Sequence, residues 1–364
     1  MQMQLSVIAA SSDCPPNRGR MNALDVATAT LGFQRPKRSR LNVPTADLSI
    51  AIMKLVIAGG TGQVGALYRR RALARGDQVT ILTRSPRQEG DLAWDGRTLG
   101  AWQAAIDGAD VVVNLAGRTV NCRYTRKNLA EMMDSRVDST RVIGQAIIAA
   151  ERPPRVWLQM STATIYAHRL DAANDEATGI LGGSEPDVPA YWAFSTEIAK
   201  RWERTQRDAA TPDTRQVQLR AAMIMSPDRD GIFDTMARIA RWGLGGSVGG
   251  GAQYVSWIHE NDFCSALDFL IAREDLDGAV NLAAPEPLPY RVFIKDLREA
   301  VGRKIGLPAT RWMAEIGAFA LRTDTELILK SRRVVPGRLR EAGFSFAYPD
   351  WRGASRELSS RWPA

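Results

Sequence analysis

The sequence predicts an α/β fold built on a doubly wound parallel sheet, followed by a smaller C-terminal α/β cap. Strand-like and helix-like patterns alternate along most of the chain, which is typical of helices that connect parallel strands. A short apolar strand pattern at 54–58 leads directly into a glycine-rich turn and then into a helix pattern at 63–75. The first strand is apolar on both faces, as expected for a strand at the centre of such a sheet.

The glycine-rich turn contains Gly59, Gly60, Gly62 and Gly65, and it satisfies the spacing G-x-G-x-x-G. Glycines allow a positive φ and a close approach of the backbone to a pyrophosphate, while the amides of the following helix face the phosphates. The predicted fold is therefore a Rossmann domain. We expect the cofactor diphosphate to contact Gly59, Gly60, Thr61, Gly62, Gln63, Val64 and Gly65.

The next strand pattern, at 78–83, indicates which dinucleotide binds. A chain that binds NAD would carry Asp or Glu at the end of this strand to hold the ribose 2′-hydroxyl. Arg84 occurs there instead. A guanidinium can bind a 2′-phosphate through two hydrogen bonds, so the sequence favours NADP(H). The alternative is that Arg84 is a solvated loop charge.

Further patterns extend the sheet and suggest how the chain divides. Strands are expected at 110–116, 155–160, 215–225 and 254–258, with helices at 126–151 and 192–209. Ligands of such sheets bind at the carboxyl ends of the strands, which adds Leu115, Ala116 and Gly117 to the predicted cofactor contacts. We predict an NADP-binding domain at 53–226, joined by part of 250–284, and a C-terminal substrate-binding cap at 227–364.

Residues 1–52 differ from the rest of the chain. They mix Pro, Ser, Thr and Asn with six Lys or Arg and three Asp, and they show no strand or helix pattern that leads into the fold. We interpret them as a disordered extension, and Met53, directly before the first core strand, is a candidate natural start. No basic residues precede the short apolar stretch at 5–10, so a signal peptide is disfavoured.

Composition excludes several classes of protein. The formal net charge of +8 is spread along the chain without a basic stripe, which disfavours nucleic acid. No apolar run is long enough to span a bilayer. The three cysteines are scattered and the two histidines lack ligand spacing, so we expect no metal site and a reducing, cytoplasmic location. The sequence leaves open whether the chain forms a homo-oligomer or binds a protein partner.

Several short motifs together resemble one protein family. They are Asn114-Leu115-Ala116-Gly117, Ser161-Thr162 with Tyr166, Asp134-Ser135-Arg136-Val137, Trp202-Glu203, Ser256-Trp257-Ile258-His259, Asn281-Leu282-Ala283-Ala284-Pro285, and Val335-Pro336 through Ala342-Gly343-Phe344. From Met53 to about Trp351 the chain resembles an extended short-chain dehydrogenase/reductase, of the atypical branch named epimerase-family proteins. That branch ends in a domain of unknown function.

The resemblance also identifies a departure from the wider family. That family uses a Tyr-x-x-x-Lys pair for proton transfer, and a Ser or Thr that holds the substrate oxygen. Thr162 matches the Ser/Thr position. Counting back from Glu203 places Ser195 at the tyrosine position and Ala199 at the lysine position, and none of the seven tyrosines has Lys four residues later. The atypical branch resembles this chain in that respect.

Other residues are candidates for chemistry. Tyr166 and His259 could supply a proton, although a packing aromatic and a hydrogen-bonded histidine are the alternatives. Asn121 and Arg123, with Arg118, follow the fourth strand and could contact an anionic substrate, or could simply be exposed. We therefore expect an atypical NADP-dependent oxidoreductase or epimerase that acts on an unidentified small molecule. The alternative is a non-catalytic NADP(H) sensor that acts through a partner.

Overall fold

The computed structural model describes residues 52–186, 189, 192–307 and 326–363. The predicted extension lies outside these residues, apart from Ile52. The central feature is a seven-stranded sheet in the order β10-β6-β5-β4-β1-β2-β3, and all its pairings are parallel. Its strands are β1 (Lys54–Ala58), β2 (Gln78–Thr83), β3 (Asp91–Ala93), β4 (Val111–Asn114), β5 (Val156–Thr162), β6 (Arg215–Ala221) and β10 (Gly278–Leu282).

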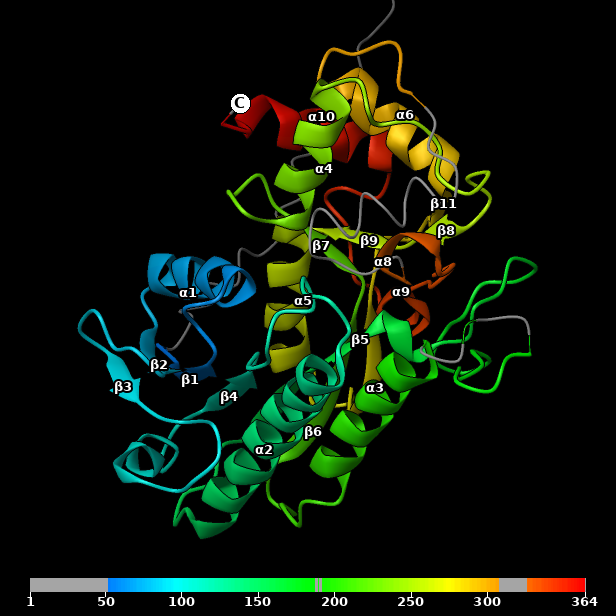
Figure 1. The fold of residues 1–364 in the computed structure, drawn as a ribbon. Helices are drawn as coiled ribbons and strands as arrows, with labels where there is room; N and C mark the ends of the chain where they lie inside the picture. Colours follow the sequence, from blue (N-terminus) through cyan, green and yellow to red (C-terminus); the bar gives the residue numbers. More distant parts are fainter. Residues whose placement is uncertain (1–51, 187–188, 190–191, 308–325, 364) are drawn as a thin grey trace, which may run out of the picture. The chain divides into compact units, whose positions relative to one another are not determined.

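Helices cover both faces of this sheet (Figure 1). The longer ones are α1 (Gln63–Arg75), α2 (Arg126–Ala149), α3 (Trp192–Arg207) and α5 (Glu260–Ala272), and short 3-10 turns are η1 (Ala101–Ala105) and η2 (Ala163–Ile165). Because successive side chains of a strand point to opposite faces, Ile57 packs with α1 and α5, whereas Val56 packs with α2. The doubly wound parallel fold predicted from the sequence is confirmed.

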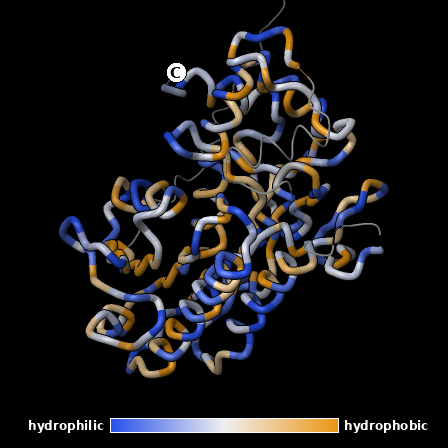
Figure 2. Tube along the Cα trace, in the orientation of Figure 1, coloured by the Kyte–Doolittle hydropathy of each residue, from blue (hydrophilic) through white to orange (hydrophobic). Residues whose placement is uncertain are grey.

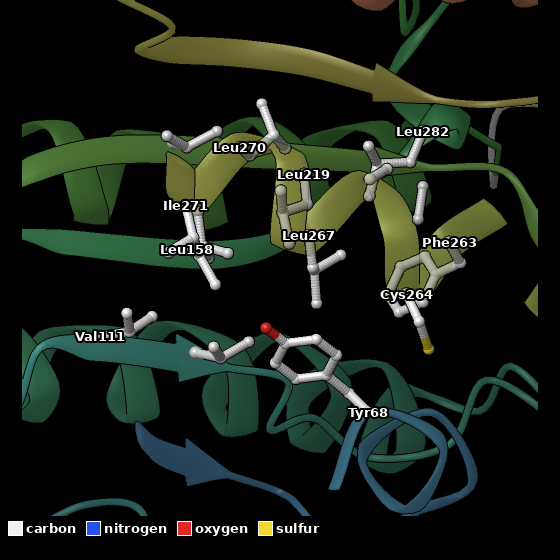
Figure 3. Close-up of a cluster of buried hydrophobic side chains, with 14 of the residues drawn as sticks. Tyr68, Val111, Leu158, Leu219, Phe263, Cys264, Leu267, Leu270, Ile271 and Leu282 are labelled. Carbon is white, nitrogen blue, oxygen red and sulfur yellow. The ribbon is translucent and has the colours of Figure 1, made fainter. Parts of the chain in front are cut away.

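The core between the sheet, α1 and α5 is continuous (Figure 3). Leu158 and Leu219 of neighbouring strands pack against Leu267 and Leu270 of α5, and Tyr68 of α1 closes the cluster. Apolar stretches likewise follow the strands in Figure 2, while the loops are more hydrophilic. Burying apolar surface stabilises the fold by about 25 cal/mol per Å². This core therefore holds the sheet and helices in place around the site.

The remaining elements form the smaller C-terminal region. They are β7 (Met223–Met225), α4 (Ile232–Arg241), β8 (Tyr254–Val255), β9 (Trp257–His259), β11 (Leu288–Pro289), α6 (Tyr290–Ala300), α8 (Glu326–Leu329), α9 (Gly337–Glu341) and α10 (Trp351–Arg361). A second core joins α4, α6 and α10, where Trp351 stacks on Phe293 with ring centroids 4.1 Å apart. In Figure 1 these three helices lie together beyond the ends of the central strands.

Two predicted strands are divided in the structure. The pattern at 215–225 forms β6, which pairs with β5 and β10, and then β7, which pairs with β9. The break lies at Ala222, whose amide still bonds to Leu282 O, whereas the amide of Met223 bonds to Ser256 O. The pattern at 254–258 likewise divides between β8 and β9. A change of pairing partner leaves no mark on local hydropathy, so the sequence did not reveal it.

Candidate functional site

The glycine turn between β1 and α1 is shaped by close backbone contacts. Gly59 has φ +77°, and a Cβ there would lie 2.9 Å from the backbone of Ala116. A Cβ on Gly65 would lie 2.4 Å from Gly59 O and 2.5 Å from Gly60 Cα. Real Cβ atoms do not approach backbone this closely, so these positions require glycine for a turn of this shape.

The first turn of α1 is open to an anion. Gly62 is its N-cap and provides no side-chain acceptor, and the first turn contains no acidic residue. The early amides of a helix have no partner within the helix and carry a partial positive charge. The buried Nε2 of Gln63 also lacks a hydrogen-bond partner in the described part of the chain. Thr61, which is exposed, places its Oγ1 3.2 Å from that of Thr83. Val64 packs against the core below.

A pocket of about 530 Å³ adjoins this turn at the end of β2. It is lined by Gly60, Thr61, Ala66, Arg69, Arg70, Leu73, Thr83, Arg84, Ser85, Arg87, Gln88 and Asp91. The carboxylate of Asp91 is paired with Arg69 at 3.1 Å. Arg84 is exposed, and no carboxylate of the described residues pairs with it. The pocket therefore offers an available guanidinium to a negatively charged group.

The end of β4 lies beside the glycine turn, at the same edge of the sheet. The amide of Leu115 bonds to Ala58 O at 2.9 Å, and that of Ala116 bonds to Asn114 Oδ1 at 3.0 Å. Gly117 follows and is exposed. Strands β2 and β3 follow on one side of β1, whereas β4, β5 and β6 follow on the other side. Ligands of doubly wound sheets bind at this kind of switch point, which here lies between β1 and β4. The structure thus brings Gly59–Gly65 together with Leu115, Ala116 and Gly117.

Thr162 is the last residue of β5 and is partly exposed at the same edge of the sheet. Its Oγ1 accepts a hydrogen bond of 3.2 Å from the amide of Thr164 in η2, of which Thr162 is the N-cap. Since Oγ1 accepts this bond, its own O–H can donate to another oxygen.

The two positions on α3 at which the wider family has its tyrosine and lysine are both buried. Ala199 is fully buried, and Ser195 Oγ donates a hydrogen bond of 2.6 Å to Glu326 Oε2. Lys330 lies beside them, with Nζ 3.8 Å from Glu326 Oε1 and 3.0 Å from Thr164 O. Burial lowers the pKa of Lys330 to about 8. Glu326 and Lys330 were not identified from the sequence, since no local pattern links them to α3.

Tyr166 is 2% exposed and belongs to a buried polar network. Its hydroxyl donates to Asn281 Oδ1 at 2.9 Å and accepts from Arg220 at 2.9 Å. Burial raises the pKa of the phenol, against the opposing effect of Arg220. Arg220 in turn holds Glu203 through two hydrogen bonds. This geometry favours the packing interpretation of Tyr166 and gives no support to its role as a proton donor.

His259 is also placed in a structural setting. Its ring is fully buried, with Nδ1 accepting a hydrogen bond from the amide of Asn261 and Nε2 2.9 Å from Glu357 Oε2. It stacks on Tyr348 with ring centroids 3.8 Å apart. Burial lowers its pKa, although Glu357 opposes that change. His259 therefore caps α5, and the structure gives no support to a contact with substrate.

The polar residues after β4 have different surroundings. Asn121 and Arg123 are exposed on the loop. Arg118 pairs with Glu131 and donates to Asn128 Oδ1 at 3.0 Å.

Within the described residues, no cluster of His, Cys, Asp and Glu could hold a metal ion. No helix in that part of the chain is long and apolar enough to cross a membrane.

Comparison with known proteins connects this geometry to a family. The NAD dependent epimerase/dehydratase family matches residues 55–283, and a domain of unknown function (DUF1731) matches residues 310–358. Human epimerase family protein SDR39U1 is 28% identical over 309 residues, which cover 84% of this chain and 99% of that protein. Epimerase family protein SH2119 of Staphylococcus haemolyticus is 30% identical over 308 residues, which cover 84% and 98% of the two chains.

Solved structures agree with these relatives. The crystal structure of human SDR39U1 with NADPH superposes with a TM-score of 0.75 at 26% identity, and covers 85% of this chain and 100% of that one. The UDP-N-acetylglucosamine 4-epimerase of Bacillus cereus shares the fold with a TM-score of 0.65 at 16% identity, over 86% and 100% of the two chains. The resemblance drawn from the sequence motifs is confirmed: the chain belongs to the NAD dependent epimerase/dehydratase family, in the branch of epimerase family proteins that end in DUF1731.

Proposed function

We propose that the chain binds NADP(H) and acts as an atypical oxidoreductase or epimerase on a small molecule. The observation that carries the proposal is the pocket after β2, in which no carboxylate from the described part of the chain pairs with Arg84, while Asp91 is paired with Arg69. A 2′-phosphate would supply the missing negative charge. The diphosphate would lie on the turn at 59–65. The binding of NADPH by human SDR39U1 supports the same choice of cofactor.

The chain's own residues suggest how such a reaction would be organised. A nicotinamide cofactor supplies or accepts a hydride when it is bound. Thr162 would hold a substrate oxygen through its O–H, since Oγ1 already accepts from the Thr164 amide. Gly117, exposed at the end of β4, leaves room for ligand beside the glycine turn.

Cofactor choice is tested by Arg84→Ala. Losing a charge-assisted contact of about 1.5–3 kcal/mol should weaken NADPH binding by roughly 10- to 150-fold and leave NADH binding almost unchanged. Fluorescence titration of both cofactors provides the measurement. Arg152→Ala is the matched control, because Arg152 has a side chain 73% exposed and does not line the pocket. Equal affinity of the unmutated protein for NADPH and NADH would refute the assignment.

A second function is favoured by one observation, namely Ser195 and Ala199 at the positions of the family's proton-transfer pair. The chain would then bind NADP(H) without turnover and act through a protein partner. Oxidation of bound NADPH by candidate carbonyl or sugar-nucleotide compounds separates the two functions. In an enzyme, Thr162→Val should reduce turnover with little change in NADPH affinity, because it removes only the hydroxyl. Turnover that is unchanged in Thr162→Val, or absent with every compound, would favour the sensor.

A further inference from the structure

Large apolar side chains are exposed on two loops of the C-terminal region. Trp242 and Leu244, which follow α4, are 77% and 53% exposed, and Ile305 and Leu307, which follow α6, are 79% and 61% exposed. In Figure 1 both helices lie with α10 beyond the ends of the central strands. Single exposed apolar residues are ordinary, whereas a group of large ones on adjoining loops indicates a surface that meets another molecule.

Hydrogen bonds hold these two loops side by side. The amide of Leu307 donates to Gly243 O at 2.8 Å, and Arg303 Nε donates to Arg241 O at 2.8 Å. Each loop also begins at a helix end with a glycine of positive φ, +80° at Gly243 and +77° at Gly302. Glycines in this conformation allow the last carbonyls of a helix to be capped. The four apolar side chains, which we call the apolar patch, are therefore presented by a defined backbone.

Three cations border the apolar patch. Arg241 belongs to the first loop, and Arg303 and Lys304 belong to the second. All three residues are exposed, and in the described part of the chain none of them pairs with a carboxylate. The loop segments 241–245 and 301–307 contain no Asp or Glu. The patch is thus bordered by positive charge that the described residues do not neutralise.

A pocket of about 360 Å³ adjoins the same loops and α10. It is lined by Arg241, Ala300, Val301, Gly302, Arg303, Ser359 and Trp362. Arg241 lies over Trp362, with Cζ 5.8 Å from the ring centroid, and Trp362 Nε1 donates to Asp234 Oδ1 at 2.8 Å. Arg303 uses Nε for Arg241 O, so its two terminal nitrogens have no partner among the described residues. Two guanidinium groups in one pocket suit a phosphate.

We propose that the apolar patch and this pocket bind the surface of an anionic phospholipid membrane. Trp242, Leu244 and Ile305 enter the boundary between headgroups and acyl chains, and Arg241 and Arg303 receive a lipid phosphate. Tryptophan is enriched at that boundary, and each Lys or Arg near an anionic leaflet strengthens binding.

The charges favour a membrane over a second copy of this chain. A two-fold contact would place the same three cations opposite one another, whereas an anionic leaflet complements them. A search for an apolar run in the sequence does not detect such a surface, because its side chains come from two separate loops. The proposal is independent of the cofactor and the substrate.

The test sediments the full chain with vesicles of phosphatidylcholine alone and with vesicles of phosphatidylcholine and phosphatidylglycerol in equal amounts. The chain should bind the anionic vesicles more tightly, and added NaCl should weaken that binding. Trp242→Ser should weaken it by roughly 10-fold or more, because a large apolar side chain is lost. Arg241→Gln combined with Arg303→Gln should weaken it by roughly 25-fold, about 5-fold for each charge.

Ile148→Ser and Arg152→Gln are the matched controls. Ile148 is 56% exposed and the side chain of Arg152 is 73% exposed, and they lie in and just after α2, a helix away from α4, α6 and α10 in Figure 1. Both variants should bind vesicles like the unmutated protein. Residues 1–52, with six Lys or Arg, are present in every variant and therefore do not account for a difference between them.

Insertion is measured separately through the fluorescence of Trp242. The other tryptophans of the described residues are at most 9% exposed. Vesicles with brominated acyl chains should therefore quench mainly the emission of Trp242. Trp242→Phe, which keeps an apolar ring, should still bind the anionic vesicles and should lose this quenching.

Membrane binding is refuted if the unmutated protein does not bind anionic vesicles, if Trp242→Ser binds them equally well, or if quenching persists in Trp242→Phe. Calorimetry with inorganic phosphate identifies one alternative: phosphate binding that requires Arg241 and Arg303, without vesicle binding, means that the pocket serves a soluble anion. Sedimentation velocity identifies another: a dimer that Trp242→Ser dissociates, without vesicle binding, means that a second copy covers the patch.

Discussion

The two halves of the proposed site are built in different ways. The phosphate-binding half consists of the glycine turn at 59–65 and the pocket after β2, and its parts lie within about one βαβ unit of sequence. The other half, where we propose that the substrate binds and which we call the reaction half, combines the end of β5, α3 and the segment 326–332. There Ser195 bonds to Glu326, 131 positions away, and Lys330 bonds to Thr196, 134 positions away. The first half depends on local backbone shape, the second on distant side chains.

This comparison predicts that the two halves fail differently when single residues change. A glycine substitution should damage cofactor binding more than the fold. Loss of one buried charge in the reaction half should damage the fold more than cofactor binding. The partners of that charge come from several elements and cannot rearrange locally.

The largest effect is expected for Glu203→Gln. Glu203 is 1% exposed, accepts two hydrogen bonds from Arg220 at 2.8 and 2.9 Å, and accepts a third from Ser161 at 2.7 Å. Removing its charge leaves Arg220 buried without its counter-ion, which should lower the free energy of unfolding by about 3–5 kcal/mol. Urea denaturation measures this change.

Glu197→Gln is the matched control on the same helix. Its carboxylate is 49% exposed and lies 3.8 Å from Arg201, so its loss should change stability by less than about 1 kcal/mol. Similar losses in the two variants would mean that the buried network does not hold this half together.

Gly65→Ala should have the next largest effect, and on the other half. Its Cβ would meet Gly59 O at 2.4 Å, so the turn must shift and the phosphate-facing amides with it. Relieving this overpacking costs about 1–3 kcal/mol. Because the turn that moves is the one that holds the phosphates, we expect NADPH affinity to fall by roughly 10- to 100-fold. In Gly100→Ala the new Cβ would come no closer than 3.5 Å to Trp102, so NADPH affinity should be retained. Undiminished affinity in Gly65→Ala would contradict the close contact.

The same contrast explains what the sequence could predict. The bounds of β2, Gln78–Thr83, agree with the predicted strand because alternation and the flanking turn are local signals. Gly59 and Gly65 were recognised for the same reason, since their spacing reflects backbone contacts within seven residues. Arg215 to Met225 was predicted as one strand, because hydropathy does not record that β7 leaves the main sheet to pair with β9.

Residues of the reaction half were harder to assign. Ser195 and Ala199 could be located by counting along α3, but their partners come from beyond residue 320. Tyr166 and His259 have side chains suited to proton transfer, and only burial and hydrogen bonding separate that role from packing. A side chain's chemistry is visible in a sequence, whereas the dielectric and partners around it are set by tertiary contacts.

The buried state of Lys330 provides the last and smallest prediction. Its ammonium interacts with Glu326 and Glu185, which favour the charge, and with Arg332 and Lys200, which oppose it. Burial is the largest influence and lowers the pKa from 10.5 to about 8. His168, which the Lys330 charge also affects, has a pKa below 6.5 and does not titrate in the alkaline range.

Because the pKa of Lys330 is lower in the folded than in the unfolded chain, the unfolded chain binds more protons between pH 8 and 10.5. Stability should therefore rise with pH through this range, and the penalty should be complete below pH 8. From pH 7 to pH 9.5 the unmutated protein should gain about 2 kcal/mol relative to Lys330→Met, in which the group is absent and other titrations cancel. Urea denaturation of both proteins at the two pH values, in buffers without phosphate, measures the difference. A constant difference would mean that Lys330 is solvated or fully compensated, and the reaction half would then contain no costly buried cation at this position.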